Sequence, residues 1–268
     1  MSGTLYIIAT PIGNLEDITL RALRVLKEVD LIAAEDTRHT KKLLTHFDIH
    51  TPLTSFFQGN ERAKAGDIVR QLLAGKNIAL VSDAGTPCIS DPGYPLLIAA
   101  IEAGITVVPI PGPSALTAAI SAAGLPTDRF TFVGFLPDKP GKRKKVLEEL
   151  RTRPETLVFY VSPWKVEKTL ADCLAILGNR KAVLCREVSK IHEEFVRENL
   201  QTLRDHLVKK PLKGEVVLLV EGAKRELSET DMIKSDPEFM REIQSGMKRL
   251  RQKTKRYSFR KVFDEPLK

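Results

Sequence analysis

Many features that would assign this chain of 268 residues to a protein class are missing from it. Its apolar runs, such as 5–9 and 78–81, are far shorter than the roughly 18 consecutive apolar residues of a membrane-spanning helix. The start of the sequence lacks the basic region, apolar core and small-residue cleavage site of a signal peptide. We therefore expect no membrane association and a cytoplasmic location.

Cysteine is scarce, since only Cys88, Cys173 and Cys185 are present, widely spaced and without a C-x-x-C pair. Such a set predicts neither a disulfide framework nor a zinc site. The His-Glu-Glu run at 192–194 also lacks the second histidine that a zinc protease helix carries one turn further on. We expect no metal.

Known nucleotide and nucleophile motifs are absent as well. The sequence contains no G-x-G-x-x-G, no G-x-x-x-x-G-K-[ST] and no G-x-S-x-G. It also lacks the glycine loop of the common seven-stranded methyltransferases. The first strand is followed by Gly13 alone, and Asp17 comes too soon to bind a ribose from the end of a second strand. The residue pattern by itself does not name a ligand.

In the first half of the chain, short β-branched apolar runs alternate with amphipathic helical patterns. Strands are expected at 5–9, 31–34, 52–56, 78–82 and 106–110. One helical apolar face is expected from Ile18, Leu20, Leu23, Val25 and Leu26, and another from Ile68, Val69, Leu72 and Leu73. This alternation favours parallel strands joined by helices, so we predict an α/β fold with an open, mostly parallel sheet in the N-terminal domain.

The composition changes after the alanine-rich segment 115–123, which we predict to be a helix. Further strands are expected at 130–133, 157–161, 182–185 and 216–220, and helices at 142–151 and 166–177. We predict an N-terminal α/β domain at 1–123, a C-terminal α/β domain at 124–222 and a charged, basic tail at 223–268.

Three of the expected strands end in loops rich in glycine and proline: 10–14 (TPIGN), 82–87 (SDAGTP) and 111–115 (PGPSA). One such loop is most simply a turn. Open α/β sheets, however, bind ligands beyond the carboxyl ends of their strands. Three such loops at one sheet edge therefore predict a ligand cleft, with Ser114 placed to cap the helix that follows.

The net charge of +8 is concentrated near the end of the chain. Between 246 and 261 there are eight basic residues and no acid. Such a stretch repels itself, and binding to RNA relieves that repulsion, although a solvated basic terminus is the alternative. We take Lys248, Arg249 and Arg251 as candidate substrate contacts.

An ordered series of motifs runs through most of the chain: YIIATPIGNLED at 6–17, AEDTR at 34–38, SDAGTPCISDPG at 82–93, PGPSA at 111–115, FVGFLP at 132–137, CREVSKIHEE at 185–194 and KGE at 213–215. On these motifs, residues 4–222 resemble the tetrapyrrole methylase superfamily of class III methyltransferases. The resemblance is to its branch of ribosomal RNA cytidine 2'-O-ribose methyltransferases.

This resemblance implies two α/β domains with S-adenosylmethionine between them, and a homodimer. It implies that the cofactor contacts are Pro11, Gly13, Ser82, Asp83, Thr86, Ser114, Ala115 and Tyr160. The carboxylate of Asp83 suits the positive sulfonium or ammonium group of that cofactor. The implied partner is small-subunit (16S) ribosomal RNA, free or in the assembled subunit.

Methylation of a ribose hydroxyl requires the removal of a weakly acidic proton. In the segment 185–194, Glu187 is our candidate base, and Lys190 is our candidate for stabilising the developing oxyanion. Arg38, next to Asp36 after the second strand, is a further candidate substrate contact. In each case an ordinary ion pair or helix cap is the alternative.

Two segments depart from the family's pattern, FFQGNE at 56–61 and VSPWK at 161–165. They leave two other functions open. One is methyl transfer to a tetrapyrrole or another small substrate, which the shared fold allows. The other is RNA binding without catalysis.

Overall fold

The computed structural model describes residues 1–209 and 213–224, together with the single positions 241, 245, 247 and 248. Residues 1–223 form one structural unit, and 224–268 form the other. Apart from 247 and 248, the basic stretch at 246–261 lies outside the described residues. Within the described part, no helix has the length and hydropathy needed to cross a membrane.

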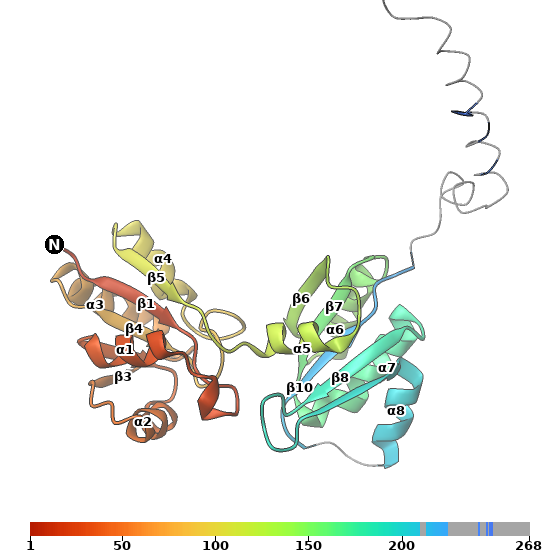
Figure 1. Cartoon of the computed structure of the whole chain (residues 1–268), viewed down its shortest axis with the longest axis horizontal. Coiled ribbons are helices and arrows are strands. Elements are labelled where there is room, and N and C mark those ends of the chain that lie inside the picture. Colours follow the sequence, from red (N-terminus) through yellow and green to blue (C-terminus); the bar gives the residue numbers. More distant parts are fainter. Residues whose placement is uncertain (210–212, 225–240, 242–244, 246, 249–268) are drawn as a thin grey trace, which may run out of the picture. The chain divides into compact units, whose positions relative to one another are not determined.

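The first sheet contains β1 (Thr4–Ile8), β2 (Leu31–Ala34), β3 (Leu53–Ser55), β4 (Ile78–Val81) and β5 (Thr106–Ile110). Its strand order is β3-β2-β4-β1-β5, and every neighbouring pair is parallel (Figure 1). The predicted parallel α/β architecture is thus confirmed. β2 and β5 have the predicted bounds. β1 and β3 differ from the prediction by one residue at each end, and β4 ends one residue earlier.

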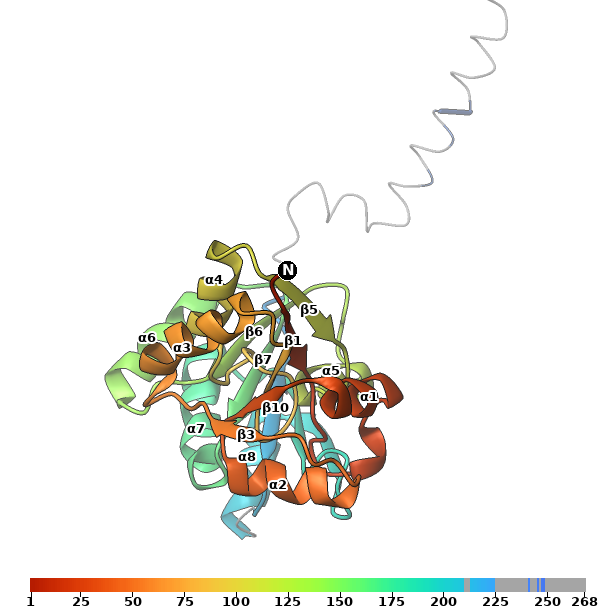
Figure 2. The same ribbon diagram turned by 90° about the vertical axis from the view of Figure 1, so that its left-hand side faces the viewer.

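Helices cover both faces of this sheet (Figure 2). On one face lie α1 (Leu20–Glu28) and α2 (Thr37–His46), and on the other α3 (Glu61–Leu73) and α4 (Tyr94–Glu102). Alternate residues of β4 serve the two faces, since Ala79 packs with α1 and α2, and Leu80 with α3 and α4. Burial on both sides explains why these strands read as continuous apolar runs.

Two residues assigned to apolar helix faces are in fact exposed. Leu20 is 85% exposed and Leu73 is 53% exposed. Each lies at one end of its helix, Leu20 at the start of α1 and Leu73 at the end of α3. Hydrophobic spacing alone did not show that these terminal turns leave their leucines in solvent.

The second sheet contains β6 (Phe130–Phe135), β7 (Thr156–Val161), β8 (Lys181–Arg186), β9 (Glu194–Asn199) and β10 (Val216–Val220). Its order is β6-β7-β10-β8-β9. β6 and β7 run parallel, and the other neighbouring pairs are antiparallel. All five residues of the central strand β10 are buried, as expected for a strand covered on both faces.

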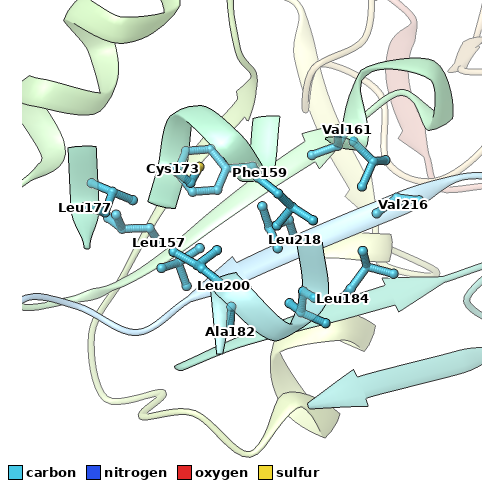
Figure 3. Close-up of a cluster of buried hydrophobic side chains, with 14 of the residues drawn as sticks. Leu157, Phe159, Val161, Cys173, Leu177, Ala182, Leu184, Leu200, Val216 and Leu218 are labelled. Atoms are coloured by element: carbon cyan, nitrogen blue, oxygen red, sulfur yellow. The ribbon is translucent and has the colours of Figure 1, made fainter. Parts of the chain in front are cut away.

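One face of this sheet packs against α6 (Pro140–Leu150), α7 (Val166–Leu177) and α8 (Leu200–Lys209). Figure 3 shows part of this core, with Phe159, Leu218 and Cys173 among its buried side chains. The opposite face packs against α5 (Ala115–Ala123). α5 therefore precedes residue 124 in the chain but shares a core with the second sheet, and the predicted domain boundary at that residue stays a prediction.

We predict that Leu218→Ala lowers the free energy of unfolding by about 2–5 kcal/mol, because it leaves a cavity in a fully buried position. Leu20→Ala is the matched control, since the same atoms are removed from a side chain that is 85% exposed. It should change the free energy by less than about 0.5 kcal/mol. Urea unfolding followed by circular dichroism measures both, and equal losses would contradict the assigned core.

Candidate functional site

The three glycine- and proline-rich loops are bonded to one another at the carboxyl ends of β1, β4 and β5. Thr10 and Gly85 exchange two backbone hydrogen bonds, of 2.8 and 2.9 Å. The Thr10 hydroxyl also donates to the Ser82 carbonyl at 3.1 Å, and the Thr86 hydroxyl donates to the Pro113 carbonyl at 3.2 Å. Since β1 lies between β4 and β5, the loops form one connected wall.

A cavity of about 350 Å³ adjoins this wall, and its lining includes residues of the second sheet. That volume lies within the usual range for small-ligand sites, roughly 300–1,000 Å³. Five residues predicted to bind the cofactor line it: Asp83, Thr86, Ser114, Ala115 and Tyr160. Residues of the quoted motifs that were not predicted to bind the cofactor line it too, among them Glu35, Asp91, Phe135 and Glu215.

The other three predicted cofactor residues, Pro11, Gly13 and Ser82, line a neighbouring cavity of about 300 Å³. Asp83 and Glu215 line both cavities. The predicted residues therefore surround two adjoining spaces, and we call them the main cavity and the second cavity.

The main cavity is acidic. Glu35, Asp83, Asp91 and Glu215 line it, and none of the described residues in its lining is lysine or arginine. Burial, and then repulsion by Asp83 and Asp91, raises the pKa of Glu35 above its ordinary value. Burial also raises the pKa of Asp91, although its hydrogen bond with Ser82 acts to lower it. Such a site favours a cationic ligand and disfavours one that carries phosphate.

Backbone groups hold these carboxylates in place. The N–H of Asp36 donates to Asp83 Oδ1 at 2.9 Å, and the N–H of Asp83 donates to Glu35 Oε2 at 3.5 Å. The loops after β2 and β4 thus fix each other's acidic side chains. Among the described residues, no three or more His, Cys, Asp or Glu side chains are arranged to hold a metal ion.

Aromatic rings form another part of the main cavity. Tyr160 and Phe135 line it with their ring centres 5.6 Å apart. The Tyr160 hydroxyl accepts a hydrogen bond of 3.1 Å from the N–H of Leu116, and burial raises the pKa of this phenol. Ser114 occupies the N-cap position of α5, as predicted, but its side chain makes no capping hydrogen bond and instead bonds Tyr160.

Lys190 lies at the second cavity in a network of charges. Its ammonium is 3.1 Å from Glu187 Oε1 and 3.1 Å from Glu215 Oε2. Partial burial acts to lower the pKa of Lys190, but these two bonds raise it overall. Partial burial likewise acts to raise the pKa of Glu187. The N–H of Glu215 and the Lys190 ammonium nevertheless lower it overall. Glu187 itself lines neither cavity.

The loop after β1 reaches this network. A Cβ atom on Gly13 would lie 2.2 Å from Cγ of Lys190, so only glycine leaves room for the lysine at this point. The Ser189 hydroxyl donates a hydrogen bond to the carboxylate of Asp17, which lies further along the connection after β1. The loops of the first sheet therefore position Lys190, which belongs to the segment between β8 and β9.

Arg38 lines neither cavity. Asp36 is the N-cap of α2, and its carboxylate accepts hydrogen bonds from the backbone N–H and the guanidinium of Arg38. These bonds hold the pKa of Asp36 well below its usual range. The Arg38 side chain is 88% exposed, which matches the helix-cap alternative. Lys248 is exposed as well, and Arg249 and Arg251 lie outside the described residues.

A family model described as tetrapyrrole (corrin/porphyrin) methylases matches residues 4–204. Proteins called ribosomal RNA small subunit methyltransferase I are similar to the chain. The one from Halalkalibacterium halodurans is 53% identical over 220 residues, which cover 82% of this chain and 76% of that protein. The one from Escherichia coli O157:H7 is 52% identical, covering 83% of this chain and 79% of that protein. The one from Streptococcus pyogenes serotype M1 is 46% identical, covering 92% of this chain and 87% of that protein.

Solved structures share the fold at low sequence identity. Diphthine synthase is 16% identical with a TM-score of 0.62, covering 82% of this chain and 90% of that one. Uroporphyrin-III-C-methyltransferase from Thermus thermophilus is 20% identical with a TM-score of 0.58, covering 81% and 94%. The family model and the relatives at 46–53% identity confirm the resemblance that the motifs indicated, and the solved structures show that the fold is shared.

We predict that Lys190→Met raises the pKa of Glu187 toward its ordinary value of 4.5, because a neighbouring cation is lost. Lys165→Met is the matched control. It removes the cation bonded to Asp138, so it should raise the pKa of Asp138 and leave Glu187 unchanged. Carbon-13 NMR titration of the side-chain carboxyls measures both. An unaltered Glu187 titration in Lys190→Met would contradict the network.

Proposed function

Since this chain belongs to the tetrapyrrole (corrin/porphyrin) methylase family, we propose that it methylates a cytidine ribose 2'-hydroxyl in small-subunit (16S) ribosomal RNA, with S-adenosylmethionine as the methyl donor. The names of relatives that are 46–53% identical to it support this substrate class. Two details rest on the motif resemblance: that the acceptor is the ribose 2'-hydroxyl, and that the nucleotide is a cytidine.

The single observation that carries the proposal is the acidic main cavity. S-adenosylmethionine carries positive charge on a sulfonium and on an ammonium. Its sulfonium makes the attached methyl group electrophilic. Glu35, Asp83 and Asp91 offer the opposite charge without any cation in the described lining. Tyr160 and Phe135 add aromatic surface, which also attracts cations. The residues present therefore fit this cofactor.

At the acceptor side, we assign the larger role to Lys190. Its raised pKa keeps the ammonium charged, so it can stabilise negative charge that develops on a ribose oxygen. Glu187 is the proposed proton acceptor, and it also orients Lys190. Its lowered pKa makes it a weak base, because the ammonium and the backbone N–H stabilise the carboxylate.

The RNA itself needs positively charged contacts. Arg38, which is exposed, and Lys248, Arg249 and Arg251 of the basic tail remain the proposed substrate contacts from the sequence. The homodimer implied by the resemblance also stays a prediction.

Tetrapyrrole methyl transfer is the other activity to be tested. Solved tetrapyrrole methyltransferases share the fold, but at 20% identity or less a shared fold does not identify the substrate. The decisive assay incubates the protein with labelled S-adenosylmethionine and three acceptors: under-methylated small subunits, naked ribosomal RNA and a tetrapyrrole precursor. We expect label in the RNA of one of the first two samples. Label in the tetrapyrrole alone would overturn the proposal.

We predict that Asp83→Asn weakens S-adenosylmethionine binding roughly tenfold, because a charged partner of the cofactor is lost while an oxygen acceptor for Asp36 remains. Asp128→Asn, at an exposed position outside the cavity, makes the same chemical change and should leave the affinity unaltered. Titration calorimetry compares the three proteins. Equal affinities for all of them would remove Asp83 from the site.

We further predict that Lys190→Ala reduces the rate of methyl transfer about 100-fold or more, and that Glu187→Gln reduces it less. The reason for the order is that the cation acts on developing charge, whereas the carboxylate is a weak base. Single-turnover assays give the rates, and mass spectrometry of digested RNA locates the methyl group. Methyl on a base would refute the ribose chemistry, and near-normal rates in both variants would refute the site.

A further inference from the structure

The start of α6 and the turn after β7 form a basic surface that the proposed function does not yet use. From 139 to 145 the sequence reads KPGKRKK, with no acid. Lys139, Lys142, Lys144 and Lys145 are exposed, and none of them forms an ion pair with the described part of the chain. We call these four lysines the α6 lysines.

Their position opposes helix stability. α6 has no acidic residue in its first turn, and its N-cap, Lys139, makes no side-chain capping bond. Cations are unfavourable there, since the helix dipole is positive at its N-terminus. Stability of the folded chain does not explain this arrangement, whereas a bound polyanion would offset the repulsion.

Arg143 differs from the α6 lysines and holds the surface in place. Its side chain is 11% exposed and forms a 2.7 Å ion pair with Asp172 of α7, and it donates to the Asp138 carbonyl at 3.0 Å. Lys165 forms an ion pair with Asp138 from the other side. The start of α6 is thereby fixed beside the short 3-10 helix η2 (Pro163–Lys165).

An exposed aromatic residue lies in η2. Trp164 is 84% exposed and is the one tryptophan of the sequence. Pro163, which precedes it, lines the main cavity. Lys165, which follows it, lines a cavity of about 310 Å³ together with Phe135 and Arg143. Phe135 is 58% exposed and also lines the main cavity. Trp164 itself lines neither cavity, but its two neighbours place η2 between the proposed cofactor site and the start of α6.

We propose that this surface binds single-stranded RNA, with Trp164 stacked on a nucleobase and the α6 lysines contacting phosphates. Aromatic side chains beside a basic groove are how proteins bind unpaired RNA, because bases offer flat faces and the backbone offers charge. The inference rests on the proposed function in that it takes the methyl acceptor to be RNA. It concerns residues other than the basic stretch at 246–261.

The single tryptophan makes the stacking measurable, since all indole fluorescence comes from Trp164. In the full-length protein, titration with a single-stranded oligocytidine RNA should quench this fluorescence. An abasic ribose-phosphate strand of the same length should bind roughly tenfold more weakly and quench little. Trp164→Ala should weaken oligocytidine binding by a similar factor, and Trp164→Phe by less. Equal affinity for both strands would overturn the stacking role.

The phosphate contacts are tested by salt dependence. The triple variant Lys142→Ala/Lys144→Ala/Lys145→Ala should lower the log-log salt slope of RNA binding by about two units, because each lost phosphate contact removes roughly 0.7 units. A control with three exposed cations removed elsewhere, Arg21→Ala/Lys27→Ala/Lys181→Ala, should retain the wild-type slope. Thermal melting verifies that both variants fold. Superimposable slopes in the three proteins would overturn the role of the α6 lysines.

Methyl transfer assays separate this inference from the proposed function. We expect Trp164→Ala to raise KM for RNA about tenfold while leaving S-adenosylmethionine affinity unchanged. If the wild type methylates ribosomal RNA and the variant has the same KM, the surface is refuted and the function stands. If Trp164 is quenched by RNA but no RNA is methylated, the function is refuted and the surface stands. Equally tight binding of a polyglutamate peptide would refute RNA as the ligand.

Discussion

The repulsion among Glu35, Asp83 and Asp91 is the constraint on which the site depends. Burial and the neighbouring carboxylates disfavour the charged forms of Glu35 and Asp91 and raise the pKa of each. Backbone hydrogen bonds hold the loops that carry these carboxylates close to one another. Among them are the two bonds between Thr10 and Gly85 and the bond from the Asp36 N–H to Asp83. A cavity preorganised in this way binds a cation without having to rearrange.

Glu215 connects this negative site to the positive charge of Lys190. It lines both cavities and bonds the Lys190 ammonium, while its backbone N–H bonds Glu187. In the proposed reaction, loss of the hydroxyl proton creates negative charge on the ribose oxygen, and transfer of the methyl group then leaves the ether oxygen and the thioether sulfur neutral. The carboxylates would hold the cationic donor, whereas the Lys190 ammonium would stabilise the negative charge that forms on the oxygen and so lower the barrier.

The sequence predicted those elements whose apolar residues are consecutive or regularly spaced. β2, β5, β10, α5 and α7 have the bounds that the pattern indicated. The edge strand β9 carries mostly exposed polar residues, so it has no hydrophobic alternation to detect. In α2, the buried residues are Thr40, Leu43 and Leu44 in an otherwise polar segment, which is too short an apolar face to recognise.

Some residues of the site could likewise be predicted from local sequence, and others could not. Asp83, Thr86, Ser114 and Ala115 could be found because glycine and proline mark their loops. Asp91 lies in the same 82–93 motif as Asp83, but Glu35 lies in the separate motif at 34–38, and the pairing of β2 with β4 brings it to the same cavity. The contact of Glu215 with Lys190 requires the antiparallel pairing of β8 with β10, which no local pattern encodes.

The raised pKa values of Glu35 and Asp91 predict that the cationic cofactor displaces protons when it binds in the main cavity. Calorimetry of S-adenosylmethionine binding at about pH 5.5, in two buffers of different ionisation enthalpy, counts the protons exchanged. The bound cation should lower the pKa values of Glu35 and Asp91, so we expect net release of protons. Binding without proton release, or with uptake, would contradict this account of the site.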